Sequence, residues 1–319
     1  YGLDKINNNL FDKLFLKLTK FHINNNTKYK NFLNFFKKKI VKIEDVQPLP
    51  VRIFKKERLV NNKVKITKML SSSGTSGDKS NIYLDKNNSY NQVYVLNKII
   101  TEFLGNKRLP MLIFDTRPKR SNEISASIAA INGFSIFGRD HTFALDEFGK
   151  LDHKNIINFV KKYRNEKKFI FGFTYNIYKY LIEKKIEKNF TLNDSILLHG
   201  GGWKKLESKK IEKNIFNKIL KNKFKIKKVI NYYGLVEQTG SIFVECKNNY
   251  FHCSNYSNVF TLDKNFNKLK FGQKGYLQLL SLLPTSYPGH SILTEDIGVI
   301  HGENNCKCGK GGKYFKVLG

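Results

Sequence analysis

The chain has 319 residues, 40% of them hydrophobic, with 26 phenylalanines and 16 tyrosines. This length suits one large or two ordinary domains with a substantial core. No run of about 18 uninterrupted apolar residues and no secretory signal is present, so the sequence predicts no transmembrane segment.

The formal net charge is +31, from 57 Lys and Arg against 26 Asp and Glu. Such a charge fits either a nucleic-acid or anionic-membrane partner, or a lysine-rich proteome with solvated lysines. We prefer the second interpretation because the lysines are spread along the chain, and we expect no nucleic-acid partner. Four cysteines are too few for a disulfide framework and are typical of a reducing cytoplasm.

Residues 7–40 carry apolar side chains at helical spacing, and Asn24-Asn25-Asn26-Thr27 divides them into two expected helices. Their aromatic stripes are expected to pack in the core. Pro48 and Pro50 end this stretch. We expect a helical lead-in over residues 1–60.

From residue 61 to residue 243, short apolar runs alternate with helical patterns. The expected strands lie at residues 64–67, 110–115, 134–137, 169–173, 195–200 and 228–231. The expected helices lie at residues 90–104, 124–131, 155–163, 175–185 and 211–220. This alternation predicts an α/β core with a largely parallel sheet flanked by helices.

From about Val244 to Gly319, short strands are joined by polar turns, which indicates an antiparallel β subdomain. The chain begins at Tyr1, not at Met, and stops at Gly319, and we expect a fragment that lacks both ends.

The loop at residues 71–79 contains hydroxyls, glycines and one charge pair, Asp78 and Lys79. Glycines let backbone N–H groups approach an anion, and hydroxyls add donors. Two residues separate Gly74 from Gly77, whereas a Walker loop has four. On these residues alone, an anion-binding loop and a flexible surface loop are both open. The loops at Ser71, Gly200 and Tyr232 all follow expected strands, so we expect them to converge on one rim of the sheet.

Four further stretches follow this loop in order. They are Leu198-His199-Gly200-Gly201-Gly202-Trp203-Lys204, Tyr233-Gly234-Leu235-Val236-Glu237-Gln238-Thr239-Gly240, Thr294-Glu295-Asp296-Ile297-Gly298 and Phe315-Lys316-Val317-Leu318-Gly319. Together with the loop, they resemble the LuxE-type acyl-protein synthetases of the adenylate-forming superfamily. The resemblance runs from residue 71 to the end and implies a fold similar to the N-domain of an adenylate-forming ligase.

The resemblance implies a cytoplasmic ligase that uses ATP and Mg²⁺ to activate a long-chain fatty acid, or another carboxylic acid, to acyl-AMP. The acyl group then passes to a protein cysteine thiol, and a reductase-like protein is an expected acyl-donating or acyl-accepting partner. The family's acceptor cysteine lies after the Phe-Lys-Val-Leu-Gly stretch, where this sequence ends, and we do not assign that role to Cys306 or Cys308. An acyl- or aryl-CoA ligase and a basic nucleic-acid-binding protein stay open as alternatives.

The resemblance also implies roles for individual residues. Glu237 would hold Mg²⁺, and Glu237 and Lys204 are the candidate catalytic residues. Asp296 would accept the ribose hydroxyls, with turn capping as the alternative. The residues expected to bind the rest of the nucleotide are Ser72, Ser73, Gly74, Thr75, Ser76, Gly77, Gly200, Gly201, Gly202, Tyr233 and Gly234.

Several of these residues have a second interpretation. Lys79 would add a point charge near phosphate, or be solvated. Tyr232 or Tyr233 would stack on adenine, or pack in the core, and the resemblance favours Tyr233 for adenine. His199 is either a structural or a catalytic histidine.

Cys306-Lys307-Cys308-Gly309 forms a turn that can present two thiolates. If residues 247–250 close a hairpin, Cys246 and either His252 or Cys253 could face that turn, because adjacent strand residues point opposite ways. Cys246, His252, Cys306 and Cys308 would make a closed structural Zn²⁺ site. Buried free thiols are the alternative.

Overall fold

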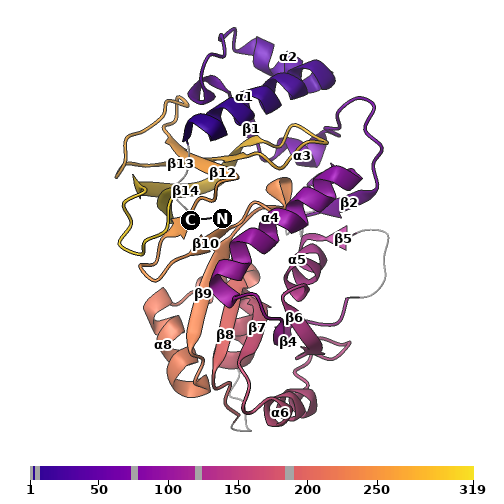
Figure 1. Cartoon of the computed structure of the whole chain (residues 1–319), viewed down its shortest axis with the longest axis vertical. Coiled ribbons are helices and arrows are strands. Elements are labelled where there is room, and N and C mark those ends of the chain that lie inside the picture. Colours follow the sequence, from indigo (N-terminus) through magenta and orange to yellow (C-terminus); the bar gives the residue numbers. More distant parts are fainter. Residues whose placement is uncertain (1–2, 4–7, 73–77, 119–123, 184–189) are drawn as a thin grey trace. The chain divides into compact units, whose positions relative to one another are not determined.

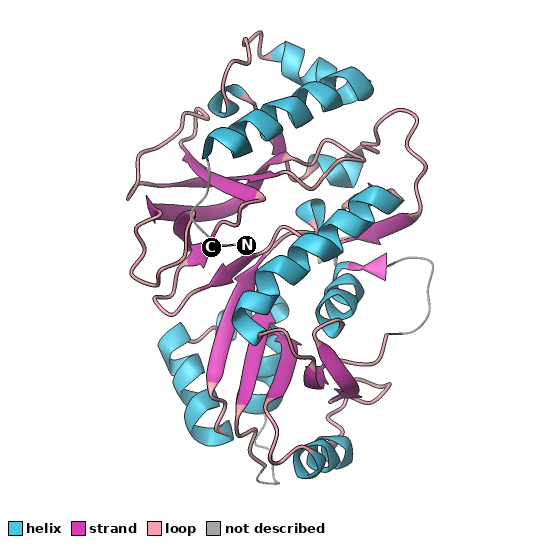
Figure 2. Ribbon diagram, viewed as in Figure 1, coloured by secondary structure: helices cyan, strands magenta, loops and turns pink. Residues whose placement is uncertain are grey.

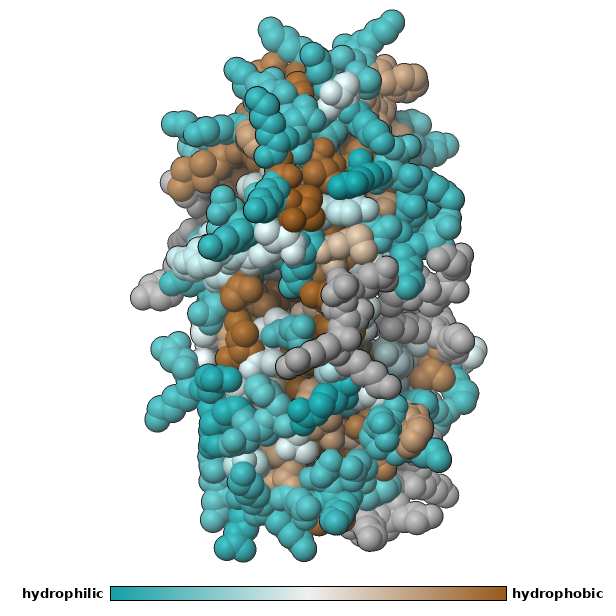
Figure 3. Space-filling view, turned by 90° about the vertical axis from the view of Figure 1, so that its right-hand side faces the viewer, coloured by the Kyte–Doolittle hydropathy of each residue, from teal (hydrophilic) through white to brown (hydrophobic). Residues whose placement is uncertain are grey.

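The structure, a computed structural model, describes residues 3, 8–72, 78–118, 124–183 and 190–319 (Figures 1 and 2). It divides into two compact units. The first unit comprises Tyr1–Ile99, Asn122–Ala126 and Gly234–Gly319, and the second comprises Ile100–Ser121 and Ser127–Tyr233. No described helix is long and apolar enough to cross a membrane. The face drawn in Figure 3 is covered largely by hydrophilic residues, as expected for a chain with 26% charged residues.

The sheet of the second unit is parallel throughout the described pairs, which agrees with the predicted alternation. Its α-helices α6 and α8 pack against the strands β6 and β9, respectively, as Figure 1 shows. The strand order is β9 (Lys228–Tyr233), β8 (Ser195–Gly200), β7 (Lys168–Phe173), β4 (Leu109–Phe114) and β6 (Gly138–Phe143). The helical segments are α5 (Ala126–Ser135), α6 (His153–Lys162), α7 (Thr174–Ile177), the π-helix η2 (Tyr178–Glu183), the 3₁₀ segment η3 (Lys204–Lys209) and α8 (Lys213–Phe224).

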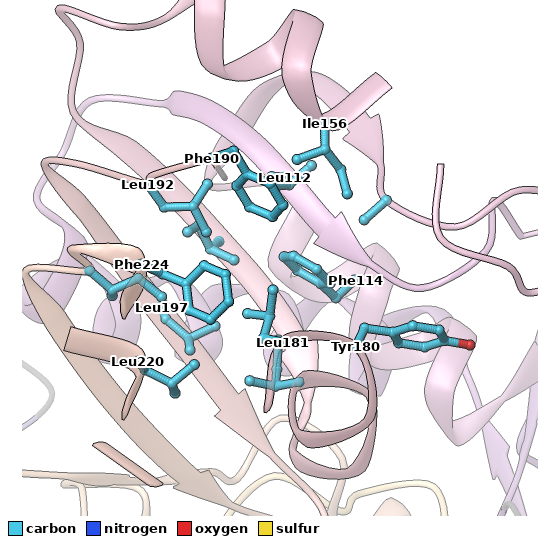
Figure 4. Packing of buried hydrophobic residues seen from close by; sticks show 14 of the residues in the cluster. Leu112, Phe114, Ile156, Tyr180, Leu181, Phe190, Leu192, Leu197, Leu220 and Phe224 are labelled. Carbon is cyan, nitrogen blue, oxygen red and sulfur yellow. The ribbon is translucent and has the colours of Figure 1, made fainter. Parts of the chain in front are cut away.

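The core of the second unit lies between this sheet and its helices (Figure 4). All residues of β7 and β8 are buried. Because both faces of these strands are covered, their sequences are largely continuous apolar runs. In Figure 4, Phe114 of β4 lies beside Leu181 and Tyr180 of η2, and Leu112 of the same strand lies beside Phe190. The expected α/β fold is therefore confirmed.

Three predicted elements need correction. The strand expected at residues 134–137 is wrong, because α5 continues to Ser135 and the strand starts at Gly138. Phe134, in the last turn of this helix, packs with its ring 4.8 Å from that of Phe171. The strand expected at residues 64–67 lies later, as β2 (Lys68–Ser71). The helix expected from residue 124 begins at Ala126, after the short strand β5 (Ile124–Ser125).

The N-terminal part of the first unit contains the two expected helices, α1 (Asn8–Asn25) and α2 (Thr27–Phe35). Asn26 separates them, and its side chain accepts a hydrogen bond of 2.9 Å from the Tyr29 backbone N–H. Phe11 and Phe15 of α1 share a core with Phe260. The short elements that follow are η1 (Ile43–Asp45), β1 (Leu49–Pro50) and α3 (Ile53–Lys56).

Two sheets complete the first unit. In the small sheet, β2 lies between β3 (Asn81–Leu84) and β5, and α4 (Lys86–Leu104) follows β3. The larger sheet is the expected antiparallel β region. Its order is β12 (Ser257–Leu262), β13 (Lys274–Ser281), β14 (Ser291–Glu303), β15 (Lys313–Val317), β11 (Phe251–His252) and β10 (Phe243–Glu245).

Candidate functional site

Glu237 is a buried carboxylate in the short 3₁₀ turn η4 (Val236–Gln238) of the first unit, with 5% of its surface exposed. Burial raises the pKa of its carboxyl group, and the Ser80 hydroxyl and the Lys55 charge oppose this only in part. None of the ion pairs between described residues includes Glu237. A carboxylate in this environment gains free energy when a cation binds to it.

The turn that carries Glu237 is held by hydrogen bonds from both of its sides. Tyr287 Oη donates to the Glu237 backbone carbonyl at 2.7 Å. Gln238 Nε2 donates to the carbonyls of Leu279 and Gly289 at 3.1 and 2.9 Å. The position of the carboxylate is therefore fixed by contacts that are distant in sequence.

Ser72 and Ser80 close the base of the Ser/Gly loop. The Ser72 N–H donates to the Ser80 carbonyl, and the Ser80 N–H donates to Ser72 Oγ, both at 2.9 Å. Ser73, Gly74, Thr75, Ser76 and Gly77 lie outside the described residues.

Ser80 also connects the base of this loop to Glu237. Its hydroxyl is buried and makes no hydrogen bond of normal geometry with a described residue, yet it is close enough to Glu237 to lower the pKa of that carboxyl group slightly. Strand β3 packs beside η4, which brings the two motifs together. The sequence analysis missed Ser80, because nothing in the local pattern distinguishes it.

The Gly200–Gly202 loop and Tyr233 lie at the same edge of the parallel sheet of the second unit. The loop follows β8, Tyr233 ends the neighbouring strand β9, and Gly200 is paired with Tyr232. The expected convergence therefore holds for these two loops. Ser71 ends β2 in a separate three-stranded sheet, so the expectation that its loop leaves the same sheet is wrong.

At two of these three positions, the local backbone structure explains why the residue is glycine. A Cβ on Gly200 would lie 2.6 Å from the Tyr232 backbone oxygen, so a larger residue does not fit there. Gly201 has φ +76°, a conformation that glycine adopts without strain. Gly202 is exposed.

The two candidate tyrosines differ in burial. Tyr232 is buried, and its ring lies 4.9 Å from that of Phe134 and 6.4 Å from that of Phe171, so it is a core residue. Tyr233 is half-buried on the opposite side of the strand. Gly234 follows, with Ile242 as its nearest packing neighbour.

His199 has the environment of a structural histidine. Burial lowers its pKa to about 3, and its ring packs 5.1 Å from that of Phe216. Its Nδ1 lies 3.0 Å from Thr174 Oγ1, which in turn donates to the Gly200 carbonyl at 3.2 Å. Since that hydroxyl has a single hydrogen, Nδ1–H is the donor to Thr174. Lys204 begins η3, directly after Trp203, which packs on Tyr178 at 4.9 Å.

Asp296 lies within strand β14, so the alternative of turn capping does not fit its position. The register between β13 and β14 shifts here, because Gln278 is opposite Leu293 whereas Tyr276 is opposite Ile297. The Asp296 N–H donates a hydrogen bond of 3.2 Å to Thr294 Oγ1. Such irregularities redirect a side chain, and they are common beside functional sites.

The four predicted metal ligands of the first unit lie together. The ligand atoms of Cys246, His252, Cys306 and Cys308 are all within 4.8 Å of one another. Residues 247–250 close the expected hairpin between β10 and β11. His252, and not Cys253, faces the cluster.

Comparison with known proteins identifies relatives of this chain. It is 24% identical over 304 residues to the long-chain-fatty-acid–luciferin-component ligase of Aliivibrio fischeri, covering 91% of this chain and 79% of that protein.

Solved structures share the fold. A 2-hydroxyisobutyryl-CoA ligase in complex with 2-HIB-AMP is 14% identical, with a TM-score of 0.67 over 97% of this chain and 67% of that one. The luciferase-like enzyme of the nonluminescent mealworm Zophobas morio is 16% identical, with a TM-score of 0.53 over 83% of this chain and 60% of that one. The fold is thus that of adenylate-forming ligases.

The model of one protein family, described as "Acyl-protein synthetase, LuxE", matches residues 4–319. The match includes the Ser/Gly loop, the Glu237 turn and Asp296, so it agrees with the motifs found in the sequence. This chain belongs to the LuxE acyl-protein synthetase family.

Proposed function

We propose that this chain activates a carboxylic acid with ATP to acyl-AMP and transfers the acyl group to a protein cysteine thiol. The observation that carries this proposal is the family match over residues 4–319. A long-chain fatty acid is the first candidate substrate, because the Aliivibrio fischeri relative is named for that substrate class. The partner would be a protein that donates or accepts the acyl group, and the proposed location is the cytoplasm, where ATP and reduced thiols are available.

In the first half-reaction, a carboxylate oxygen of the acid attacks the α-phosphorus of ATP. The bond between that phosphorus and the bridging oxygen breaks, and pyrophosphate leaves with the electron pair. In the second half-reaction, a thiolate attacks the acyl carbon and AMP leaves. The first step joins two anions, so the protein must hold and screen negative charge.

Glu237 is the residue that would bind Mg²⁺, because carboxylate oxygen is a preferred ligand of this ion. Its burial and the absence of a described ion pair support this role. The ion would supply positive charge to the phosphates, and the fixed η4 turn keeps the carboxylate in place for it.

The other proposed roles concern the nucleotide. In the first unit, residues 72–77 would donate to the phosphates, and Asp296 would accept from both ribose hydroxyls, as a carboxylate can. In the second unit, Tyr233 would stack on adenine and Gly201 and Gly202 would let the backbone approach the adenylate, with Lys204 as a proposed cationic partner. The half-buried position of Tyr233, beside a fully buried Tyr232, supports the adenine role.

The experiment follows a labelled long-chain fatty acid through both half-reactions. With ATP and Mg²⁺, we expect labelled acyl-AMP on thin-layer chromatography. When a candidate acyl-accepting protein is added, we expect a protein-bound label that hydroxylamine releases, as it does from a thioester.

Two other outcomes have definite meanings. Efficient transfer of the label to coenzyme A would favour a CoA ligase. Failure to form acyl-AMP with any acid from short to long chain would contradict the proposal. Glu237→Gln should form much less acyl-AMP than the wild type. Its matched control is Glu245→Gln, since Glu245 is also a buried carboxylate of the first unit but lies in β10.

A further inference from the structure

The cysteines and the histidine of two neighbouring turns in the first unit form one cluster. Cys246 follows β10 and His252 ends β11, whereas Cys306 and Cys308 lie between β14 and β15. We propose that this cluster binds one structural Zn²⁺ ion. The inference goes beyond acyl activation and does not depend on it.

The spacing of the ligand atoms fits a single ion. In a tetrahedral zinc site, bonds of about 2.3 Å to sulfur and about 2.1 Å to nitrogen place the ligand atoms roughly 3.6 to 3.8 Å apart. His252 Nε2 lies 3.3 Å from Cys308 Sγ, and no pair of ligand atoms is more than 4.8 Å apart. A contraction of about 1 Å at most would close the set around the ion.

The tautomer of His252 is already suited to a metal. Its Nδ1 lies 3.0 Å from the Gly311 carbonyl, which can only accept, so Nδ1 carries the hydrogen. The Nε2 lone pair then faces the three sulfurs. Zinc-binding histidines are usually oriented in this way, by a hydrogen bond from the ring nitrogen that does not bind the metal.

The sulfurs also have donors directed at them. The Lys310 backbone N–H lies 3.4 Å from Cys308 Sγ, and Asn248 Nδ2 lies 3.8 Å from Cys306 Sγ. Gly309 has φ +86°, a backbone conformation that favours glycine, although a Cβ at this position would contact no other atom within 4 Å. Such N–H groups stabilise thiolates, which are the form that binds zinc.

The donor set indicates the role of the ion. Three sulfurs and one imidazole complete a tetrahedral shell, which leaves no position for a substrate and is typical of structural sites. The ion would join the β10–β11 hairpin to the β14–β15 turn. It would thereby hold β15, where Phe315 pairs with Phe251 of the hairpin.

The test is metal analysis of the purified full chain by mass spectrometry. We expect about one zinc per chain in the wild type, and less than about a tenth of that in Cys306→Ser and Cys308→Ser. The control is Cys253→Ala, since Cys253 is fully buried next to His252 but does not belong to the cluster. That variant should keep its zinc.

A second measurement covers the case in which the serine variants fail to fold. Wild-type protein in which Co²⁺ replaces zinc should show the visible bands of tetrahedral cobalt and a thiolate charge-transfer band. Wild-type protein without zinc, in which the cluster thiols react freely with a thiol reagent, would overturn the proposal. An intact mass lower by two hydrogens, from a disulfide in the cluster, would overturn it as well.

Discussion

Tyr287 Oη donates a hydrogen bond of 2.7 Å to the backbone carbonyl of Glu237. The two residues are 50 positions apart, and both are buried. This bond holds the turn that carries the proposed Mg²⁺ ligand, so we propose that Tyr287 is a positioning residue for the Glu237 carboxylate.

Tyr287→Phe is expected to lower kcat for adenylation roughly tenfold, because it leaves a buried carbonyl without its donor at a cost of about 1–3 kcal/mol. The ring is kept, so its packing 6.1 Å from Phe54 is preserved. Steady-state kinetics with varied ATP and Mg²⁺ will measure this effect. If Tyr287→Phe lowers only the melting temperature and leaves kcat unchanged, the residue has no positioning role.

Tyr232 and Tyr233 should respond differently to alanine. Tyr232→Ala removes a fully packed core ring and should cost roughly 3–5 kcal/mol of unfolding free energy. Tyr233→Ala should instead raise KM for ATP roughly tenfold with a smaller loss of stability, and Tyr233→Phe should restore the KM because the ring face remains. Denaturant unfolding and ATP titrations will separate the two effects. Equal KM values in Tyr233→Ala and the wild type would exclude the adenine role.

Asp296→Asn should weaken ATP binding by roughly ten- to a hundredfold, since hydrogen bonds to a charged acceptor are worth about 1.5–3 kcal/mol. Its neighbour on β14 supplies the control. Glu295 is exposed and pairs with Arg52, so Glu295→Gln should leave KM for ATP unchanged. A second measurement compares the KM for ATP with that for 2′-deoxy-ATP, which lacks one of the two ribose hydroxyls. The proposed role predicts that Asp296→Asn loses most of the discrimination between them.

Two stacked histidines in the first unit predict acid sensitivity. His22 belongs to α1, and its ring stacks on that of His290 at a distance of 4.6 Å. Burial lowers the pKa of His22 to about 4. His22 Nε2 donates to the Pro284 carbonyl while Nδ1 accepts from Asn61, so the neutral form is fully hydrogen-bonded. Protonation would add charge to a buried stack.

The unfolded chain, whose histidine has an ordinary pKa of about 6.5, binds more protons than the native chain between that value and about pH 4. The free energy of unfolding should therefore fall as the pH drops below about 6.5, by about 2 kcal/mol at pH 5 from His22 alone. Urea unfolding from pH 7 to pH 4.5 will measure it. His22→Gln should reduce this slope by the share of one histidine, because burial also lowers the pKa values of His199 and His290. A wild-type slope of zero in this range would contradict the prediction.

Local sequence patterns predicted those parts of the fold that depend on local physics. The asparagine-rich break at Asn26 divides α1 from α2 because its side chain caps the second helix. Strands β7 and β8 were identifiable as apolar runs because both faces are buried. Strand β6 was missed because it lies at the edge of its sheet and is only partly buried, so its sequence is largely polar.

The surroundings of the candidate site could not be predicted in the same way. Ser80 and Tyr287 approach Glu237 only through tertiary packing, and no local pattern distinguishes them from other serines and tyrosines. The cysteine–histidine cluster was predictable because a short hairpin turn allows Cys246 and one of two adjacent residues to face the second turn. The choice of His252 over Cys253 needed the strand register.

The central claim is that this chain forms acyl-AMP with the help of Glu237. The most direct measurement is the exchange of labelled pyrophosphate into ATP, with and without carboxylic acids of increasing chain length. We predict exchange that requires both an acid and Mg²⁺, and a fall of about two orders of magnitude or more in Glu237→Gln, comparable to the loss of other transition-state electrostatics. Exchange that proceeds without any acid, or at the wild-type rate in Glu237→Gln at saturating Mg²⁺, would contradict the account.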